Sequence, residues 1–366
     1  MSYRYKKVVV KVGSNVVTRA DGTLDVTRLS SLVDQIALLH KAGIEIILIS
    51  SGAVAAGKSE LTTHKKLDDV SQRQLYSAVG QAKLIDRYYE LFREHNISVG
   101  QILTTKEDFS TRRHYLNQRN CMQVMLDCGV IPIVNENDTI AVSELMFTDN
   151  DELSGLIASM MDMEALFILS NVDGIYDGPP ADANTQVIRQ VEPGKDLTDY
   201  IQQGKSSFGR GGMLTKATIA RKIADEGITV YISNGERASI LQELLTSPAP
   251  LGTCFLPAPI EVSNIKKWMA HSESFTQGAL WLNETASELF EKSSTVASIL
   301  PVGLMRVEGT FKKDDIVRIL NNNGDKIGVG KVRYNSEKIT TMLGKHGLRA
   351  VVHYDYLYIE ETYEIN

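Results

Sequence analysis

The stretch Lys6-Lys7-Val8-Val9-Val10-Lys11-Val12-Gly13-Ser14-Asn15-Val16 decides the fold. Its apolar run lies between lysines and is broken by Gly-Ser-Asn, which predicts a buried strand that ends in a tight turn of main-chain N–H groups. Such a turn can hold an anion, and the strand carries Lys11 up to it, where an ammonium group could neutralise a phosphoryl group. A lysine that snorkels from a strand end explains Lys11 equally well.

Length and composition indicate a two-domain globular protein. The chain has 366 residues, more than one typical core accommodates, and its 43% hydrophobic and 23% charged residues are ordinary for a soluble protein. A net charge of −6 and a pI near 5.7 argue against a protein whose main role is to coat nucleic acid.

Neither a membrane segment nor a metal-binding or disulfide framework is indicated. No apolar run approaches the roughly 18 residues of a spanning helix and no signal-peptide pattern opens the chain, so we expect a cytoplasmic protein with no membrane partner. Cys121, Cys128 and Cys254 are scattered without C-x-x-C spacing, and we expect them to be small buried fillers.

The next segments continue the first strand into a parallel sheet. Apolar residues at helical spacing run from Leu29 to Leu39, Gly43 stops that helix, and residues 44–49 form a β-branched strand. A strand, a helix and a second strand of this kind form a βαβ unit. Further strands are predicted at 97–103, 130–134, 165–169 and 229–232, with a long helix at about 71–94. The predicted fold is therefore α/β, and its ligands bind at the carboxyl ends of the strands.

Small or polar residues follow two of these strands, and a third polar cluster lies at the start of a later helix. Residues 50–57, with Ser51 and Gly52, allow close approach of a ligand, although tight helix packing explains small residues as well. Asn135-Glu136-Asn137-Asp138 could bind a small polar substrate, with Asp138 suited to an ammonium group, or could be a local Asx turn. Asp149-Asn150-Asp151 could be ordinary helix capping, but three consecutive Asx residues exceed what a cap requires.

A second glycine-rich loop precedes a later helix. The sequence Phe208-Gly209-Arg210-Gly211-Gly212-Met213-Leu214-Thr215-Lys216 would present N–H groups and a positive helix end to phosphates, with Lys216 as a movable charge, although a flexible hinge is the alternative. It is not a Walker A loop. Ser170-Asn171, at the end of the 165–169 strand, could contact a nucleotide.

From about residue 275 the sequence changes to short β-like runs, which predict a small β-barrel. We therefore expect domains at 1–260 and 276–366, joined by a linker at 261–275. The second domain has 11 Lys plus Arg against 12 Asp plus Glu. Because phosphate contacts demand positive charge, nucleic-acid binding is not expected of this domain as a whole.

Two lysines at glycine-containing loops, an acidic cluster and a polar pocket together point to phosphoryl transfer. That chemistry needs cationic charge and in-line positioning more than a nucleophilic side chain. Lys11 and Lys216 would supply the charge, and Mg²⁺ would bridge the nucleotide phosphates, held mainly by substrate oxygens and water. No Ser/His/Asp order or H-E-x-x-H motif supports a hydrolase.

These motifs, in this order, resemble the amino-acid kinase family, and within it the glutamate 5-kinases. The resemblance rests on Lys11-Val12-Gly13-Ser14, Ser51-Gly52-Ala53, Asn135 to Asp138, Asp149 to Asp151 and Gly211 to Lys216. The tail, with Glu308-Gly309-Thr310-Phe311 and Gly330-Lys331-Val332-Arg333-Tyr334, resembles a PUA domain. The fold implied is a mainly parallel sheet sandwiched by helices, followed by a small β-rich PUA-like barrel.

The resemblance implies phosphorylation of the L-glutamate γ-carboxylate by ATP with Mg²⁺, the first step of proline biosynthesis. It assigns catalysis to Lys11, Lys216 and Asp151, and glutamate binding to Ser51, Gly52, Asn135, Asp138 and Asn150. It assigns ATP binding to Lys11, Gly13, Ser170, Asn171, Gly211, Gly212, Met213, Leu214, Thr215 and Lys216. A homo-oligomer, dimer or tetramer, and feedback inhibition by proline are further implications.

Two departures from the family pattern bear on the nucleotide contacts. Ser170-Asn171 stands where Thr-Asp is common, and Arg210 precedes the paired glycines where a small residue is usual. The alternatives are an acetylglutamate or uridylate kinase of the same fold, or an RNA-binding protein that acts through its C-terminal domain. The PUA-like tail and the loop from Asn135 to Asp138 favour glutamate.

Overall fold

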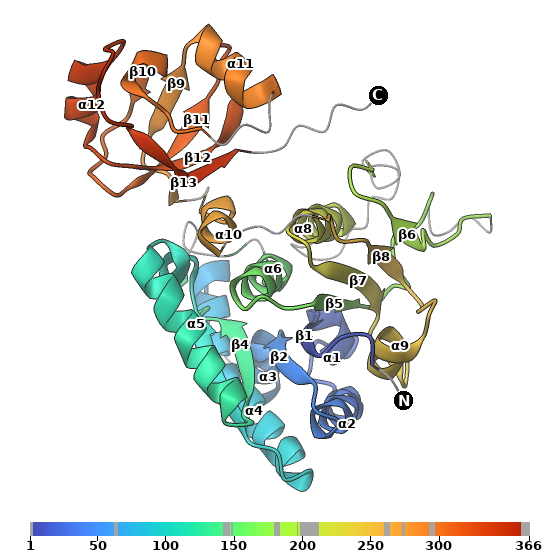
Figure 1. Ribbon diagram of the computed structural model, residues 1–366. Helices are drawn as coiled ribbons and strands as arrows, with labels where there is room; N and C mark the ends of the chain where they lie inside the picture. The colour runs from blue at the N-terminus through green and yellow to red at the C-terminus, as the bar shows by residue number, and fades with distance from the viewer. Residues whose placement is uncertain are drawn as a thin grey trace. The chain divides into compact units, whose positions relative to one another are not determined.

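The computed structural model divides into two compact units, residues 1–261 and 262–366 (Figure 1). It describes residues 3–61, 65–141, 147, 149–178, 184–195, 197, 212–259, 264–272, 275–292 and 297–359. The range 261–275, for which the sequence predicts a linker, contains the helix α10 (Asn264–Ala270), which belongs to the second unit. In the described residues, no helix is long and apolar enough to cross a membrane.

The first unit is built on an eight-stranded sheet of order β3-β4-β2-β1-β5-β7-β8-β6. The first six strands of that order run parallel, and β8 pairs antiparallel with β7. The bounds are β1 Lys7–Val12, β2 Glu45–Ser50, β3 Val99–Thr104, β4 Ile131–Glu136, β5 Ala165–Ser170, β6 Gln190–Val191, β7 Thr229–Asn234 and β8 Thr253–Phe255. This confirms the mainly parallel sheet that the βαβ pattern predicts.

Helices cover both faces of this sheet, as Figure 1 shows. One face carries α1 (Ser14–Val17), α2 (Val26–Lys41), α4 (Asp69–Glu94) and α9 (Ile240–Thr246). The other face carries α5 (Arg112–Asp127), α6 (Asn150–Met160) and α8 (Met213–Asp225). The short helix α3 (Ala53–Glu60) packs on α4, and the 3-10 helix η1 (Lys106–Phe109) precedes α5.

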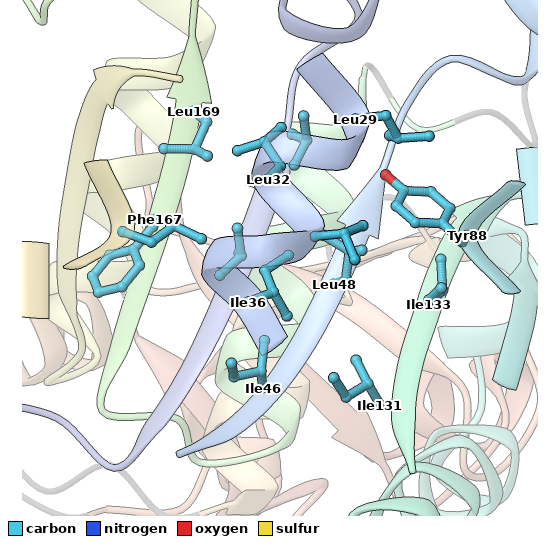
Figure 2. Close-up of a cluster of buried hydrophobic side chains, with 14 of the residues drawn as sticks. Leu29, Leu32, Ile36, Ile46, Leu48, Tyr88, Ile131, Ile133, Phe167 and Leu169 are labelled. Carbon is cyan, nitrogen blue, oxygen red and sulfur yellow. The ribbon is translucent and has the colours of Figure 1, made fainter. Parts of the chain in front are cut away.

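One hydrophobic core lies between the sheet and α2. Figure 2 shows side chains of α2 facing apolar side chains of β2, β4 and β5. The labelled members are Leu29, Leu32, Ile36, Ile46, Leu48, Tyr88, Ile131, Ile133, Phe167 and Leu169. Burial of each such side chain contributes roughly 1.5–3 kcal/mol, so this core fixes the helices on the sheet.

The pleat of β1 decides where Lys11 points. Val8, Val10 and Val12 belong to the core with α2, and because side chains alternate along a strand, Val9 and Lys11 face α6 on the other side. Lys11 is 4% exposed, so it is a buried cation and not a lysine that snorkels to solvent.

The second unit contains a five-stranded sheet of order β10-β9-β11-β12-β13. Its strands are β9 Ala279–Leu282, β10 Leu304–Glu308, β11 Ile316–Leu320, β12 Lys326–Val332 and β13 Val352–Ile359. All five lie in the region after about residue 275, for which the sequence predicts short β-like runs. The helices are α10, α11 (Glu284–Lys292) and α12 (Ser336–Met342), with the 3-10 turn η4 (Pro301–Gly303).

The prediction that the cysteines are buried fillers is wrong. Cys121 and Cys128 are exposed and Cys254 is half-buried. Cys121 lies in α5, whose buried residues are Tyr115 and Met122, and Cys128 is the residue that caps this helix. The apolar character of the thiol therefore does not decide their position.

The contact between α3 and α4 depends on Gly80. A Cβ atom at this position would lie 1.7 Å from the carbonyl oxygen of Ala53 and 2.5 Å from the amide nitrogen of Gly57. Only a residue without a side chain allows the two backbones to approach this closely, and the contact holds α4 beside the loop at Ser51 and Gly52.

We predict that Gly80→Ala lowers the free energy of unfolding by about 1–3 kcal/mol or more, because overpacking outweighs the roughly 1 kcal/mol that alanine gains over glycine in a helix. Urea unfolding followed by far-UV circular dichroism measures this. Ala78→Gly, at an exposed position of the same helix, is the matched control and should cost only about 1 kcal/mol. A Gly80→Ala variant more stable than the wild type would contradict the claim that the contact between α3 and α4 requires glycine.

Candidate active site

A cavity of about 420 Å³ lies at the carboxyl ends of the central strands. Its lining includes Lys11 of β1, Ser51 after β2, Asn135 of β4 and Ser170 of β5. The parallel topology brings these residues to one edge of the sheet although they are separated by up to 159 positions in the chain.

Two lysines bind one carboxylate at this edge. Lys11 Nζ lies 2.5 Å from Asp151 Oδ1, and Lys216 Nζ donates to Asp151 Oδ2 at 2.8 Å. Asp151 is fully buried, and the side chains of Lys11 and Lys216 are 5% and 12% exposed. The Lys11–Asp151–Lys216 cluster therefore carries a formal charge of +1 in a site with little water.

Burial alone would raise the pKa of Asp151, but the two ammonium groups outweigh it and lower the pKa to about 2. Asp151 is thus ionised at every physiological pH. Removing one partner of a buried ion pair typically costs about 3–5 kcal/mol, so each of the three groups depends on the others.

Asp149 fixes the start of α6, which presents Asp151. Asp149 Oδ1 accepts the N–H groups of Asp151 at 2.9 Å and Glu152 at 3.1 Å, so it is the N-cap of this helix. Burial and the Asp151 charge raise the pKa of Asp149 to about 6. Asp149 Oδ2 is buried and has no hydrogen-bond partner in the part of the chain that the structure describes.

Asn150 connects the strand-end loops. Its Nδ2 donates to Ser51 Oγ and to Asn135 Oδ1, both at 2.9 Å. Gly52, which follows Ser51, has a φ of 112°, a left-handed conformation in which the chain turns directly from β2 into α3. This turn places Ser51 against the N-terminal end of α6.

Arg73 of α4 forms a second charged group in the cavity. Its guanidinium donates to Glu136 Oε2 at 3.1 Å and to Asp138 Oδ1, and Ser77 Oγ donates to Asp138 Oδ2 at 3.3 Å. Burial is the main cause that raises the pKa of Glu136, to about 7, and the Asp138 charge adds to it. With both carboxylates ionised, the Arg73–Glu136–Asp138 cluster has a formal charge of −1.

Comparison with known proteins identifies the family. Residues 6–234 match the amino acid kinase family and residues 285–354 match the PUA domain. The chain is 66% identical to the glutamate 5-kinase of Bacteroides thetaiotaomicron over 98% of this chain and 100% of that protein. It is 46% identical to the glutamate 5-kinase of Chlorobaculum tepidum, over 97% and 98% of the two chains. The chain belongs to the glutamate 5-kinase family.

The residues for which the family resemblance implies a nucleotide role lie at the ends of β1 and β5 and at the start of α8. Ser170 ends β5 and donates to Asn171 Oδ1 at 3.4 Å, while Gly212 caps α8, whose first turn holds Met213, Leu214, Thr215 and Lys216. The N–H of Gly13 donates to the Leu169 carbonyl at 3.0 Å, so this amide is already bonded within the sheet edge. Gly211 and Arg210 lie outside the described residues.

Sequence reasoning missed Arg73 and gave Glu136 no role of its own. A signal was present, because Arg73, Ser77 and Gln81 follow each other at intervals of four in a helix whose continuing stripe is apolar. All three side chains bond to the segment 136–138, with Gln81 Nε2 donating to the Glu136 carbonyl at 3.3 Å. The side of α4 that faces the protein is thus polar near its N-terminus and apolar further along, and the polar part faces the pocket.

We predict that stability falls between about pH 4.5 and pH 7 partly because of Glu136. Its folded-state pKa is raised, so the folded chain binds more protons than the unfolded chain in this range and loses that contribution as pH rises. Glu136→Gln should therefore show a smaller decline in the free energy of unfolding, measured by urea unfolding at pH 5, 6, 7 and 8. Glu94→Gln, at the exposed end of α4, is the matched control, and equal declines in all three proteins would contradict the assignment.

Proposed function

We propose that the protein transfers the terminal phosphoryl group of ATP to the γ-carboxylate of L-glutamate, giving L-glutamyl 5-phosphate and ADP, the first step of proline biosynthesis. The observation that carries this proposal is the charge arrangement of one cavity. The Lys11–Asp151–Lys216 cluster is positive, and the Arg73–Glu136–Asp138 cluster is negative once Glu136 is ionised. The amide of Asn150 connects them through Asn135. Glutamate has matching groups, a γ-carboxylate and an α-ammonium.

In this proposal Lys11 and Lys216 stabilise the charge on the phosphoryl group as it moves. A glutamate γ-carboxylate oxygen forms a bond to the γ-phosphorus while the bond from that phosphorus to the β,γ-bridging oxygen breaks, and ADP leaves. Both ammonium groups have a fixed position before the reaction because Asp151 binds them, so little reorganisation is needed. Asp151 is a positioning residue, since both of its oxygens are occupied by lysines.

Glutamate would bind between the two clusters. Ser51, Asn135 and Asn150 offer hydroxyl and amide groups, Gly52 gives the loop its turn, and Asp138 with Glu136 favours the ammonium group. Asp149, whose buried Oδ2 has no hydrogen-bond partner among the described residues, lines the same cavity and can accept a hydrogen bond from a ligand. An N-acetylated substrate lacks the positive charge that Glu136 and Asp138 would recognise.

The residues present fit ATP with Mg²⁺ as a joint substrate. Ser170, Asn171 and the first turn of α8, residues 212–216, lie on the elements beside the lysine cluster, and the N-terminal end of a 13-residue helix favours phosphate. Within the described ranges, no group of three His, Cys, Asp or Glu side chains could hold a metal. Mg²⁺ would be held mainly by the nucleotide and water, and would neutralise part of the phosphate charge.

A homo-oligomer and inhibition by proline belong to the same proposal, because the family resemblance implies them. Analytical ultracentrifugation and an activity titration with proline measure the two properties.

The proposed reaction predicts an acyl phosphate that hydroxylamine traps as a hydroxamate when glutamate, ATP and Mg²⁺ are supplied together. The yield should depend on all three, and aspartate, N-acetylglutamate and UMP should give little product. Turnover of N-acetylglutamate without turnover of free glutamate would contradict the assignment.

We predict that Lys216→Ala lowers kcat by about 100-fold or more while the KM for glutamate changes only a few-fold, as expected when a group acts mainly on the transition state. Lys222→Ala removes the same charge from the last turn of the same helix and should retain near wild-type kinetics. A loss confined to glutamate affinity would rule out the proposed role of Lys216.

A further inference from the structure

The C-terminal unit has a cavity of its own, of about 530 Å³. Three segments around β12 and β13 contribute to its lining, which consists of residues 313–314, residues 331–334, and Arg349, His353 and Tyr356. Main-chain hydrogen bonds tie these segments together, from Asp314 N–H to the Val332 carbonyl at 2.8 Å and from Arg333 N–H to the Val351 carbonyl at 2.9 Å. The cavity is therefore built on the sheet and not on a free loop.

Positive charge is concentrated at this cavity. Lys313, Lys331, Arg333 and Arg349 line it, four of the 11 Lys and Arg residues between positions 276 and 366, against a single acid, Asp314. Lys331 Nζ lies 3.5 Å from Asp314 Oδ1. Among the described residues, Lys313, Arg333 and Arg349 form no ion pair. A near-neutral domain thus gathers a formal charge of +3 around one hollow.

The two guanidinium groups decide which anion suits this charge. Arginine presents a planar fork of donors that matches the oxygens of a phosphate, whereas one carboxylate would leave much of the charge uncompensated. A volume of 530 Å³ falls within the range of small-molecule sites. A compact ligand with several linked negative charges matches both the positive charge and the volume of this cavity.

Stacking of nucleic-acid bases is disfavoured at the same place. Lys331 Nζ covers the ring of Tyr356 at 4.1 Å, and Lys338 Nζ covers the ring of Tyr334 at 4.7 Å. Proteins that bind single strands without sequence preference rely on open aromatic faces for the bases, and here a cation lies over each of these two tyrosine rings.

We propose that this cavity binds a small anion with a condensed phosphate chain, either inorganic or part of a nucleotide. The cations supply the recognition, and Lys331 is preorganised by Asp314 and Tyr356. This site is separate from the phosphoryl-transfer cavity of the first unit, with which it shares no residue.

Isothermal titration calorimetry of the full chain tests the proposal with inorganic tripolyphosphate, with ADP and with a single-stranded RNA dodecamer as probes. The test variant is Arg333→Gln with Arg349→Gln. The control is Arg306→Gln with Arg318→Gln, which removes one exposed and one half-buried arginine of the same unit, neither of which lines the cavity. The wild type and both double variants keep the first unit unchanged, so any binding there is the same in all three. The test is therefore the difference in affinity between the two double variants.

We expect the test variant to lose at least fivefold more affinity than the control for tripolyphosphate or ADP. A loss for both probes shows that the phosphate chain suffices, and a loss for ADP alone assigns the ligand to the nucleotides. A difference in affinity below fivefold for both tripolyphosphate and ADP, or a loss of affinity for RNA alone, would overturn the proposal. Equal thermal unfolding midpoints of the two variants would exclude a folding defect as the cause.

Discussion

The structure depends on one buried carboxylate that is held between two ammonium groups. Removing an ion from water costs several kcal/mol even after the protein relaxes, and Asp151 is fully buried. Lys11 and Lys216 compensate this cost, and each of them is in turn fixed by Asp151. Because β1 and α8 are about 200 residues apart in the sequence, this cluster depends on the tertiary fold of the first unit, which brings the two elements together.

The parallel sheet supplies the geometry that the cluster needs. β1 lies between β2 and β5, so its carboxyl end adjoins the loop that carries Ser51 and the end of β5 at Ser170. The pleat turns Lys11 away from the α2 core and toward α6, whose capped first turn presents Asp151. Hydrophobic packing on one face of the sheet thus determines the electrostatics on the other face, and the Arg73 cluster adds the opposite charge from α4.

Much of this arrangement could be predicted from the sequence, because strands buried on both faces are continuous apolar runs and polar residues after them mark the ligand edge. This pattern, together with the family resemblance, predicts Lys11, Asp151 and Lys216 as site residues. Their contact could not be derived from spacing, since it depends on the strand order. Arg73 was missed because its partners lie 63 and 65 positions away, and Cys121 and Cys128 show that an apolar side chain alone does not determine burial.

The most direct test of the lysine–carboxylate cluster is the carboxyl ¹³C titration of Asp151 by NMR, with the signal assigned by its absence in Asp151→Asn. Because two ammonium groups lower the pKa to about 2, the account predicts that the signal keeps its ionised shift down to pH 4. A midpoint at or above the ordinary value of 3.8 would show that the two lysines do not converge on this carboxylate, and would contradict the account.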